Sequence, residues 1–137
     1  MAMTQEEFNR YLSEAQSGDV TAQFNVGCAY MLGEGVEKDL VQAVFWYNKA
    51  AEQGDPDAQN SLGVCYAKGL GTQPSIAKGI DWFAKAARQG HVQAYRNLQA
   101  MKAELKKGKP AEREAKRKEE QGELTFLQKL SRLFFEQ

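Results

Sequence analysis

The segment AQFNVGCAYMLGEG, residues 22–35, returns 36 residues later as AQNSLGVCYAKGLG, residues 58–71. The stretch that follows it, WYNKAAEQGD at 46–55, returns at the same offset as WFAKAARQGH at 82–91. Self-similarity at a fixed period of this length is the sequence signature of a repeat array. We therefore expect the chain to contain two complete copies of one structural unit.

Parts of the same unit precede and follow the two complete copies. RYLSEAQSGD at 10–19 matches the end of a unit, and AYRNLQAM at 94–101 matches the start of one. In the later part, Gln99 and Lys102 stand where complete units have glycine and tyrosine. The sequence thus predicts two full units with half a unit on each side.

Each unit contains two stretches in which apolar residues recur at helical spacing. Ala22, Val26 and Tyr30 recur every four residues, and the apolar residues of 43–51 recur at intervals of three and four. Such spacing gathers apolar side chains on one face of a helix. GEG at 33–35 lies between the two stretches, where glycine allows the chain to reverse direction. Each unit is therefore predicted to be a pair of helices.

The glycines are better explained as turns than as a phosphate-binding loop, because such a loop should follow a strand and open a helix. Gly54 is expected just past the second helix, followed by Asp55 as an N-cap and Pro56 at the first position of the next helix.

Gly27 and Gly63 lie inside helical stretches, where glycine costs about 0.5–1 kcal/mol relative to alanine. We expect a close approach of the paired helix to explain them. Small residues on that helix would permit the approach, namely Ala50, Ala51, Ala86 and Ala87. Trp46 and Trp82 are expected to fill the gaps between units.

The pattern A-x3-[VL]-G-x2-Y-x2-G-x-G, followed by [WF]-[YF]-x-K-A-A-x-Q-G in a 36-residue period, resembles the Sel-one-like repeat, a relative of the tetratricopeptide repeat. The resemblance covers roughly residues 8–104. With the helix pairs, it predicts an all-α fold: a right-handed α/α solenoid of two full repeats with flanking half repeats. Because Asp39, typical of the loop before the second helix, becomes Ser75, and Val36 becomes Thr72, we expect the second loop to be less tightly held.

The resemblance also implies a function. Proteins of this kind act as adaptors or regulators that bind other proteins, without catalysis of their own. The alternative is a bacterial immunity or inhibitor protein that neutralises a specific toxin or enzyme by direct binding. An adaptor should engage a short segment, whereas an inhibitor should bury a large surface of one enzyme.

Composition excludes several other classes of protein. Lys+Arg 18 against Asp+Glu 18 gives a formal net charge of +0, so no overall field attracts nucleic acid. No stretch approaches the length of a membrane span, and the N-terminus lacks an export signal. We expect a soluble, cytoplasmic protein, or a periplasmic or secreted one if a signal peptide was removed. Two cysteines, Cys28 and Cys65, fit two buried thiols without a disulfide.

No set of residues predicts catalysis, a metal site or a cofactor. The single histidine, His91, occupies a turn whose equivalents are Asp19 and Asp55, so we expect an exposed capping residue. Tryptophans and tyrosines at equivalent positions of successive repeats are expected to be packing residues.

The candidate binding surface lies on the first helix of each unit, which by similarity to tetratricopeptide-like arrays lines a concave groove. Positions that do not serve packing vary from unit to unit there and suit a partner peptide or protein. They are Phe24, Asn25, Met31, Asn60, Ser61, Val64, Lys68, Arg96 and Asn97. The amides would pair with the backbone of the partner, and Lys68 or Arg96 with a carboxylate. Alternatively, Phe24 and Met31 are partly buried between units.

The C-terminal part differs in composition from the repeats. We divide the chain into the solenoid at 1–107, a charged helical linker at 108–122 and an amphipathic helix at 123–137. The helix carries apolar residues at helical spacing, including Leu127, Leu130, Phe134 and Phe135. It could cap the last repeat helix near Leu98 and Met101, associate with a second copy, bind a separate partner or attach to a membrane surface.

Overall fold

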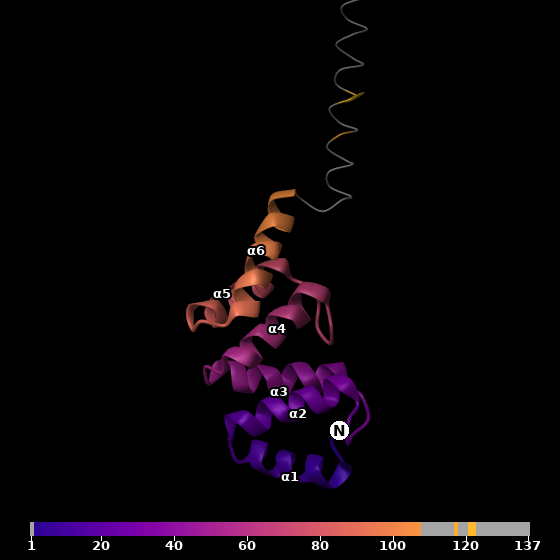
Figure 1. Cartoon of the computed structure of the whole chain (residues 1–137). Coiled ribbons are helices and arrows are strands. Elements are labelled where there is room, and N and C mark those ends of the chain that lie inside the picture. The colour runs from indigo at the N-terminus through magenta and orange to yellow at the C-terminus, as the bar shows by residue number, and fades with distance from the viewer. Residues whose placement is uncertain (1, 108–116, 118–120, 123–137) are drawn as a thin grey trace, which may run out of the picture. The chain divides into compact units, whose positions relative to one another are not determined.

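The computed structural model describes residues 2–107, 117 and 121–122. The chain divides into two compact units, 1–102 and 103–137, and the fold below is that of the first. The described residues form six helices and no strand, which confirms the all-α prediction (Figure 1). The helices are α1 (Gln5–Gln16), α2 (Val20–Leu32), α3 (Leu40–Glu52), α4 (Pro56–Lys68), α5 (Ile76–Arg88) and α6 (Val92–Lys107).

Most of the predicted linker at 108–122 and all of the predicted helix at 123–137 lie outside the described residues. The residues proposed for a cap or an interaction there, Leu127, Leu130, Phe134 and Phe135, therefore stay a prediction.

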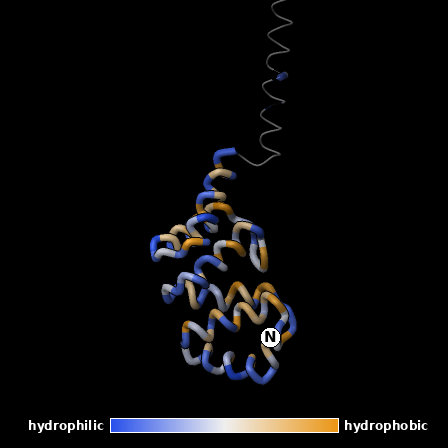
Figure 2. Tube along the Cα trace, in the orientation of Figure 1, coloured by the Kyte–Doolittle hydropathy of each residue, from blue (hydrophilic) through white to orange (hydrophobic). Residues whose placement is uncertain are grey.

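The helices follow the repeat. α2 with α3 and α4 with α5 are the two complete units, whereas α1 and α6 are the half units before and after them. From α1 to α5, each helix packs against the next one along the chain (Figure 1). α1 is mostly hydrophilic along its length (Figure 2) and buries only Phe8 and Ala15, as the terminal helix of an array should.

Polar caps start the helices where the sequence predicts them. The side chain of Asp19 accepts a hydrogen bond from the backbone N–H of Ala22 at 2.7 Å, and Asp55 caps Ala58 in the same way at 2.8 Å. Gly33 ends α2 in the left-handed conformation, with φ 70°, which confirms the turn at GEG.

Two hydrophobic clusters hold the helices together. The first joins α1 and α2 and includes Trp46 of α3, which is 6% exposed. The second joins α3 and α4, and Trp82 of α5 packs against it. Each tryptophan therefore packs against helices that precede its own, as expected for residues that fill the gaps between units.

Gly27 and Gly63 do mark a close approach of the paired helix, and the atoms nearest to each glycine belong to an aromatic ring of that helix. A Cβ atom on Gly27 would lie 2.6 Å from Cδ1 of Tyr47, and one on Gly63 would lie 2.6 Å from Cδ1 of Phe83. The glycine thus makes room for an aromatic ring that lies flat against the backbone. The sequence reasoning did not foresee these rings; of the alanines expected to permit the approach, Ala50, Ala51 and Ala86 are buried in the core.

Hydrogen-bonded glutamine pairs, which the sequence reasoning missed, connect each unit to the backbone before it, and each pair has one buried member, Gln23 or Gln59. Gln53 donates from Nε2 to Oε1 of Gln23 at 2.7 Å and to the carbonyl of Gly18 at 3.3 Å. Gln23 in turn donates to the carbonyl of Ala15 at 3.2 Å. One period later, the same bonds run from Gln89 to Gln59 and Gly54, and from Gln59 to Ala51.

The loop before α5 keeps the capping hydrogen bonds of the loop before α3, but Val36 of the first loop packs against a hydrophobic cluster and its equivalent in the second loop is Thr72. Ser75 caps α5 by accepting from Lys78 N–H at 3.2 Å, where Asp39 caps α3 by accepting from Gln42 N–H at 3.1 Å. The N–H of Ser75 also bonds the carbonyl of Tyr66 at 2.8 Å. The cap survives the change from aspartate to serine because both residues are effective N-caps.

Candidate partner-binding surface

The nine residues predicted for binding lie on the first helices of the repeats, and we call their surface the first-helix face. They come from α2 (Phe24, Asn25, Met31), α4 (Asn60, Ser61, Val64, Lys68) and α6 (Arg96, Asn97). Lys68 and Arg96 are exposed and the others are half-buried. All nine therefore keep some surface that a partner could contact.

Phe24 and Met31 pack against the second hydrophobic cluster while remaining half-buried. The ring of Phe24 lies 5.8 Å from that of Tyr47, centroid to centroid. Packing and partner contact are not exclusive at these two positions, because each side chain is covered on only part of its surface.

The asparagines of the first-helix face bond to one another. Asn97 donates from Nδ2 to Oδ1 of Asn60 at 2.9 Å, and Gln93 donates to Oδ1 of Asn97 at 3.1 Å. Asn97 thus ties α6 to α4. Among the described residues, the Nδ2 group of Asn60 has no protein acceptor and stays available to a ligand.

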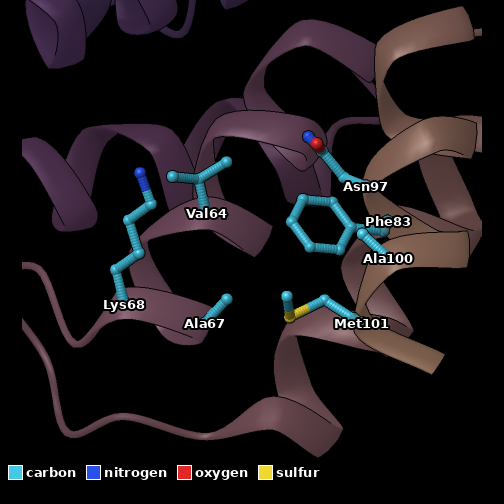
Figure 3. A pocket seen from close by; sticks show the side chains of 7 residues that line it. All are labelled: Val64, Ala67, Lys68, Phe83, Asn97, Ala100 and Met101. Carbon is cyan, nitrogen blue, oxygen red and sulfur yellow. The ribbon is translucent and has the colours of Figure 1, made fainter. Parts of the chain in front are cut away.

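An open pocket of about 180 Å³ lies among α4, α5 and α6. Figure 3 shows its lining, which is apolar with two polar groups at the edges: Val64, Ala67, Lys68, Phe83, Asn97, Ala100 and Met101. Only three of the predicted residues, Val64, Lys68 and Asn97, line this pocket. The sequence reasoning missed the other four.

The pocket arises from differences between the two complete units. Ala67 occupies the place that Met31 holds one unit earlier, and Phe83 occupies the place of Tyr47. The hydroxyl of Tyr47 bonds the sulfur of Cys28 at 3.4 Å, and Met31 packs against the neighbouring cluster. The second unit lacks both the methionine side chain and the hydroxyl, so space remains open.

The charge around the pocket is positive. Between residues 20 and 102, the first helices carry three cationic side chains, Lys68, Arg96 and Lys102, and one acidic side chain, Asp57. Asp57 is already paired with His91 at 2.9 Å. In the part of the chain that the structure describes, Lys68 forms no ion pair. A carboxylate is therefore the natural counterpart of this surface.

His91 caps α6, as predicted, but it is not exposed. Its Nδ1 accepts from the N–H of Ala94 at 3.0 Å, so the proton resides on Nε2, which donates to Asp57. The side chain is only 17% exposed because it bridges α6 and α4. Both ring nitrogens are thus engaged.

The two cysteines are free thiols, but only Cys65 is buried as predicted, whereas Cys28 is half-buried. Burial raises the pKa of the Cys28 thiol, and burial raises the pKa of Cys65 to about 11. A raised pKa suppresses the thiolate, which is the nucleophilic form. Across residues 2–107 and the few described beyond them, no three His, Cys, Asp or Glu side chains gather as metal ligands, and no helix could cross a membrane.

The chain matches a known family of repeat proteins. The model of the family described as the Sel1 repeat matches residues 20–55 and 56–91, so the matched copies begin where α2 and α4 begin. The comparison with curated proteins returned no match.

Solved structures of bacterial proteins are similar to the chain. A Sel1 repeat protein from Oxalobacter formigenes is 37% identical over 69% of this chain, with a TM-score of 0.66. The protective antigen c5321 of uropathogenic Escherichia coli strains, which displays an SLR fold, is 33% identical over 78% of this chain, with a TM-score of 0.72. The chain spans 39% and 22% of the lengths of these two.

The Helicobacter pylori cysteine-rich protein B is more similar in size. It is 28% identical over 69% of this chain and 71% of its own, with a TM-score of 0.65. The similarity extends beyond the two matched repeats, because 69% of the chain is a longer stretch than residues 20–91.

Proposed function

This chain belongs to the Sel1 repeat family. We propose that it is a non-enzymatic adaptor or regulator that binds a partner on its first-helix face. Sel1 repeat proteins generally mediate protein–protein interactions. The observation that carries the proposal for this face is the apolar pocket with an unpaired lysine at its edge. Apolar surface that is exposed beside an unpaired lysine is typical of a site that binds a peptide or protein.

The pattern of variation between units supports the same surface. Ala22, Ala58 and Ala94 are identical at a buried position that packing requires. The surface position two residues later changes from Phe24 through Asn60 to Arg96. Side chains that differ where packing does not constrain them can serve recognition, because each unit then presents a different group to a partner.

A catalytic role has little support. His91 has both ring nitrogens engaged, and burial disfavours the thiolate of Cys65. We therefore propose no catalytic residue and no cofactor, with a protein or peptide as the only class of ligand.

The proposal is tested by affinity capture from an extract of the organism that encodes the protein. The bait is the full chain, compared with a Lys68→Glu/Arg96→Glu variant. A Lys38→Glu/Arg88→Glu variant is the control, because it reverses two exposed charges outside the first helices. We expect one partner to be retained by the wild type and the control and lost by the first variant, with equal melting temperatures. Retention by all three would refute binding at the first-helix face.

The same experiment separates an adaptor from an inhibitor. An immunity or inhibitor protein should retain one folded enzyme in a 1:1 complex and abolish its activity when the two are mixed. An adaptor should retain a partner through a short segment that still binds as an isolated peptide.

A further inference from the structure

We infer that the pocket among α4, α5 and α6 anchors the partner by receiving a phenylalanine or leucine side chain from a segment that carries an aspartate or glutamate close by. This inference rests on the proposed function and specifies the chemistry of its partner. It follows from the size of the pocket, from the way the two units differ and from the charge at the edge.

The size of the pocket fits one apolar side chain. An apolar protein cavity of about 150 Å³ accepts a benzene molecule, and this pocket measures about 180 Å³. Its base is the ring of Phe83, which is 2% exposed, and its walls are Val64, Ala67 and Met101 (Figure 3). A phenyl or isobutyl group would therefore be surrounded by apolar atoms on most sides.

The comparison between units shows that the open space is not required by the fold. The first unit places Met31 where the second has Ala67, and the backbones of α2 and α4 end in the same way, with Gly33 at φ 70° and Gly69 at φ 71°. The repeat therefore accepts a methionine at the position equivalent to 67 in the first unit. Among the described residues, the shorter alanine leaves apolar walls uncovered, and an apolar group entering from a partner would remove that surface from water.

The positive charge at the edge of the pocket favours an acidic residue close to the anchored side chain of the partner. Lys68 lines the pocket and, among the described residues, has no acidic partner. Arg96 adds a second exposed cation to the first-helix face. The Lys68 side chain is long and flexible, so its ammonium group can meet a carboxylate one or two residues from the anchored side chain.

The carboxylate belongs to a side chain rather than to the end of the partner chain. Terminal carboxylates are held by clustered backbone N–H groups. The pocket residues of α4, Val64 to Lys68, form the last turns of that helix, where the free backbone groups are carbonyls. The pocket thus offers an ammonium and an amide, without the N–H cluster that a chain end needs.

The test uses a blocked peptide, acetyl-Ser-Phe-Ser-Glu-Ser-amide, titrated into the full-length ¹⁵N-labelled protein and followed by NMR. We expect saturable shifts concentrated at the amides of Val64, Ala67 and Met101. Replacing Phe by Ala in the peptide should abolish saturation. Replacing Glu by Gln should weaken binding about threefold, as expected for an exposed ion pair. A free C-terminal carboxylate should give no further gain, and a large gain would overturn the choice of a side-chain carboxylate.

Two variants of the protein make the test specific. Ala67→Met fills the pocket with the residue that the repeat already accepts at position 31, so we expect at least tenfold weaker binding and an unchanged or higher melting temperature. Lys68→Gln should remove the difference between the Glu and Gln peptides. Ala77→Met is the matched control, because it makes the same substitution at an exposed position of α5 that does not line the pocket, and it should leave binding unchanged.

The outcomes separate this inference from the proposed function. If the Ala67→Met protein folds and binds the peptide as tightly as the wild type, the anchor is refuted. The same conclusion follows if the wild type shows no saturable shift. If a natural partner is lost by the Lys68→Glu/Arg96→Glu variant but retained by Ala67→Met, the adaptor function stands and only the anchor fails. If the wild type captures no partner, the proposed function itself fails.

Discussion

Replacing Gly63 by alanine should destabilise this protein, although the same change usually stabilises a helix. In an ordinary helix interior, alanine is favoured over glycine by about 0.5–1 kcal/mol. Here the new Cβ would lie 2.6 Å from both Cδ1 and Cε1 of Phe83 and 3.1 Å from Cζ. Phe83 is only 2% exposed, so its ring cannot swing into solvent. Either the ring or the backbone of α5 must move.

The expected magnitude follows from two opposing contributions. Overpacking a core by one carbon costs about 1–3 kcal/mol. Subtracting the helix-propensity gain of about 0.5–1 kcal/mol leaves a net loss of roughly 1 kcal/mol. For a domain of this size, that loss corresponds to a fall in Tm of about 4–8 °C. Thermal and urea unfolding followed by circular dichroism at 222 nm would measure both quantities.

Two comparisons show whether the ring is the cause. Gly27→Ala should behave like Gly63→Ala, because its Cβ would meet the ring of Tyr47 at the same 2.6 Å. In a Phe83→Leu background, which lacks the outer ring carbons, Gly63→Ala should become neutral or stabilising. A rise in Tm for Gly63→Ala in the wild-type protein would refute the close-approach explanation.

Three further predictions concern other parts of the structure. Gln89→Ala leaves the buried Gln59 without its hydrogen-bond donor and should lower the free energy of unfolding by about 1–2 kcal/mol. Gln73→Ala, in an exposed loop, should change the free energy of unfolding little. Equal effects of the two substitutions would contradict a structural role for the glutamine pair. Because burial raises the pKa of Cys65 from 9.0 to about 11, its contribution to stability should be present below pH 9 and be lost as the pH rises through 11. Urea unfolding at pH 8 and pH 11 should show this loss in the wild type and less of it in Cys65→Ala. Truncation after Gly122 should lower Tm by several degrees, about 1 kcal/mol, if the predicted C-terminal helix caps the array; an unchanged Tm would favour an interaction tail.

The helices and their ends could be predicted from the sequence because the repeat supplies the same information twice. Gly33 and Asp55 act locally, through backbone conformation and capping, so their roles follow from their neighbours in the chain. An offset of 36 residues then confirmed each local signal in the second copy. The half units at both ends followed from the same comparison.

The contacts between helices were harder to predict. The sequence showed that Gly27 needed a close neighbour, but helical spacing alone did not decide between the Ala50 methyl group and the Tyr47 ring. Gln23 and Gln53 were present in the quoted repeats, yet their bond joins side chains 30 residues apart, and periodicity says nothing of that pairing. Packing and hydrogen-bond partners depend on side-chain reach in three dimensions.

The pocket was missed for a different reason. The sequence reasoning searched the first helices for side chains that could contact a partner, whereas the pocket depends on a side chain that is small. Ala67 in place of Met31 was visible in the aligned repeats. Comparing equivalent positions for loss of volume would have found it.

The glutamine pairs have a direction that bears on how the chain is made. Gln53 reaches back to the carbonyl of Gly18, and Gln89 reaches back to the carbonyl of Gly54, in each case 35 residues earlier. Every acceptor is therefore synthesised before its donor. As the chain leaves the ribosome, the acceptor of each bond is available before its donor, which suits assembly from the N-terminus during translation.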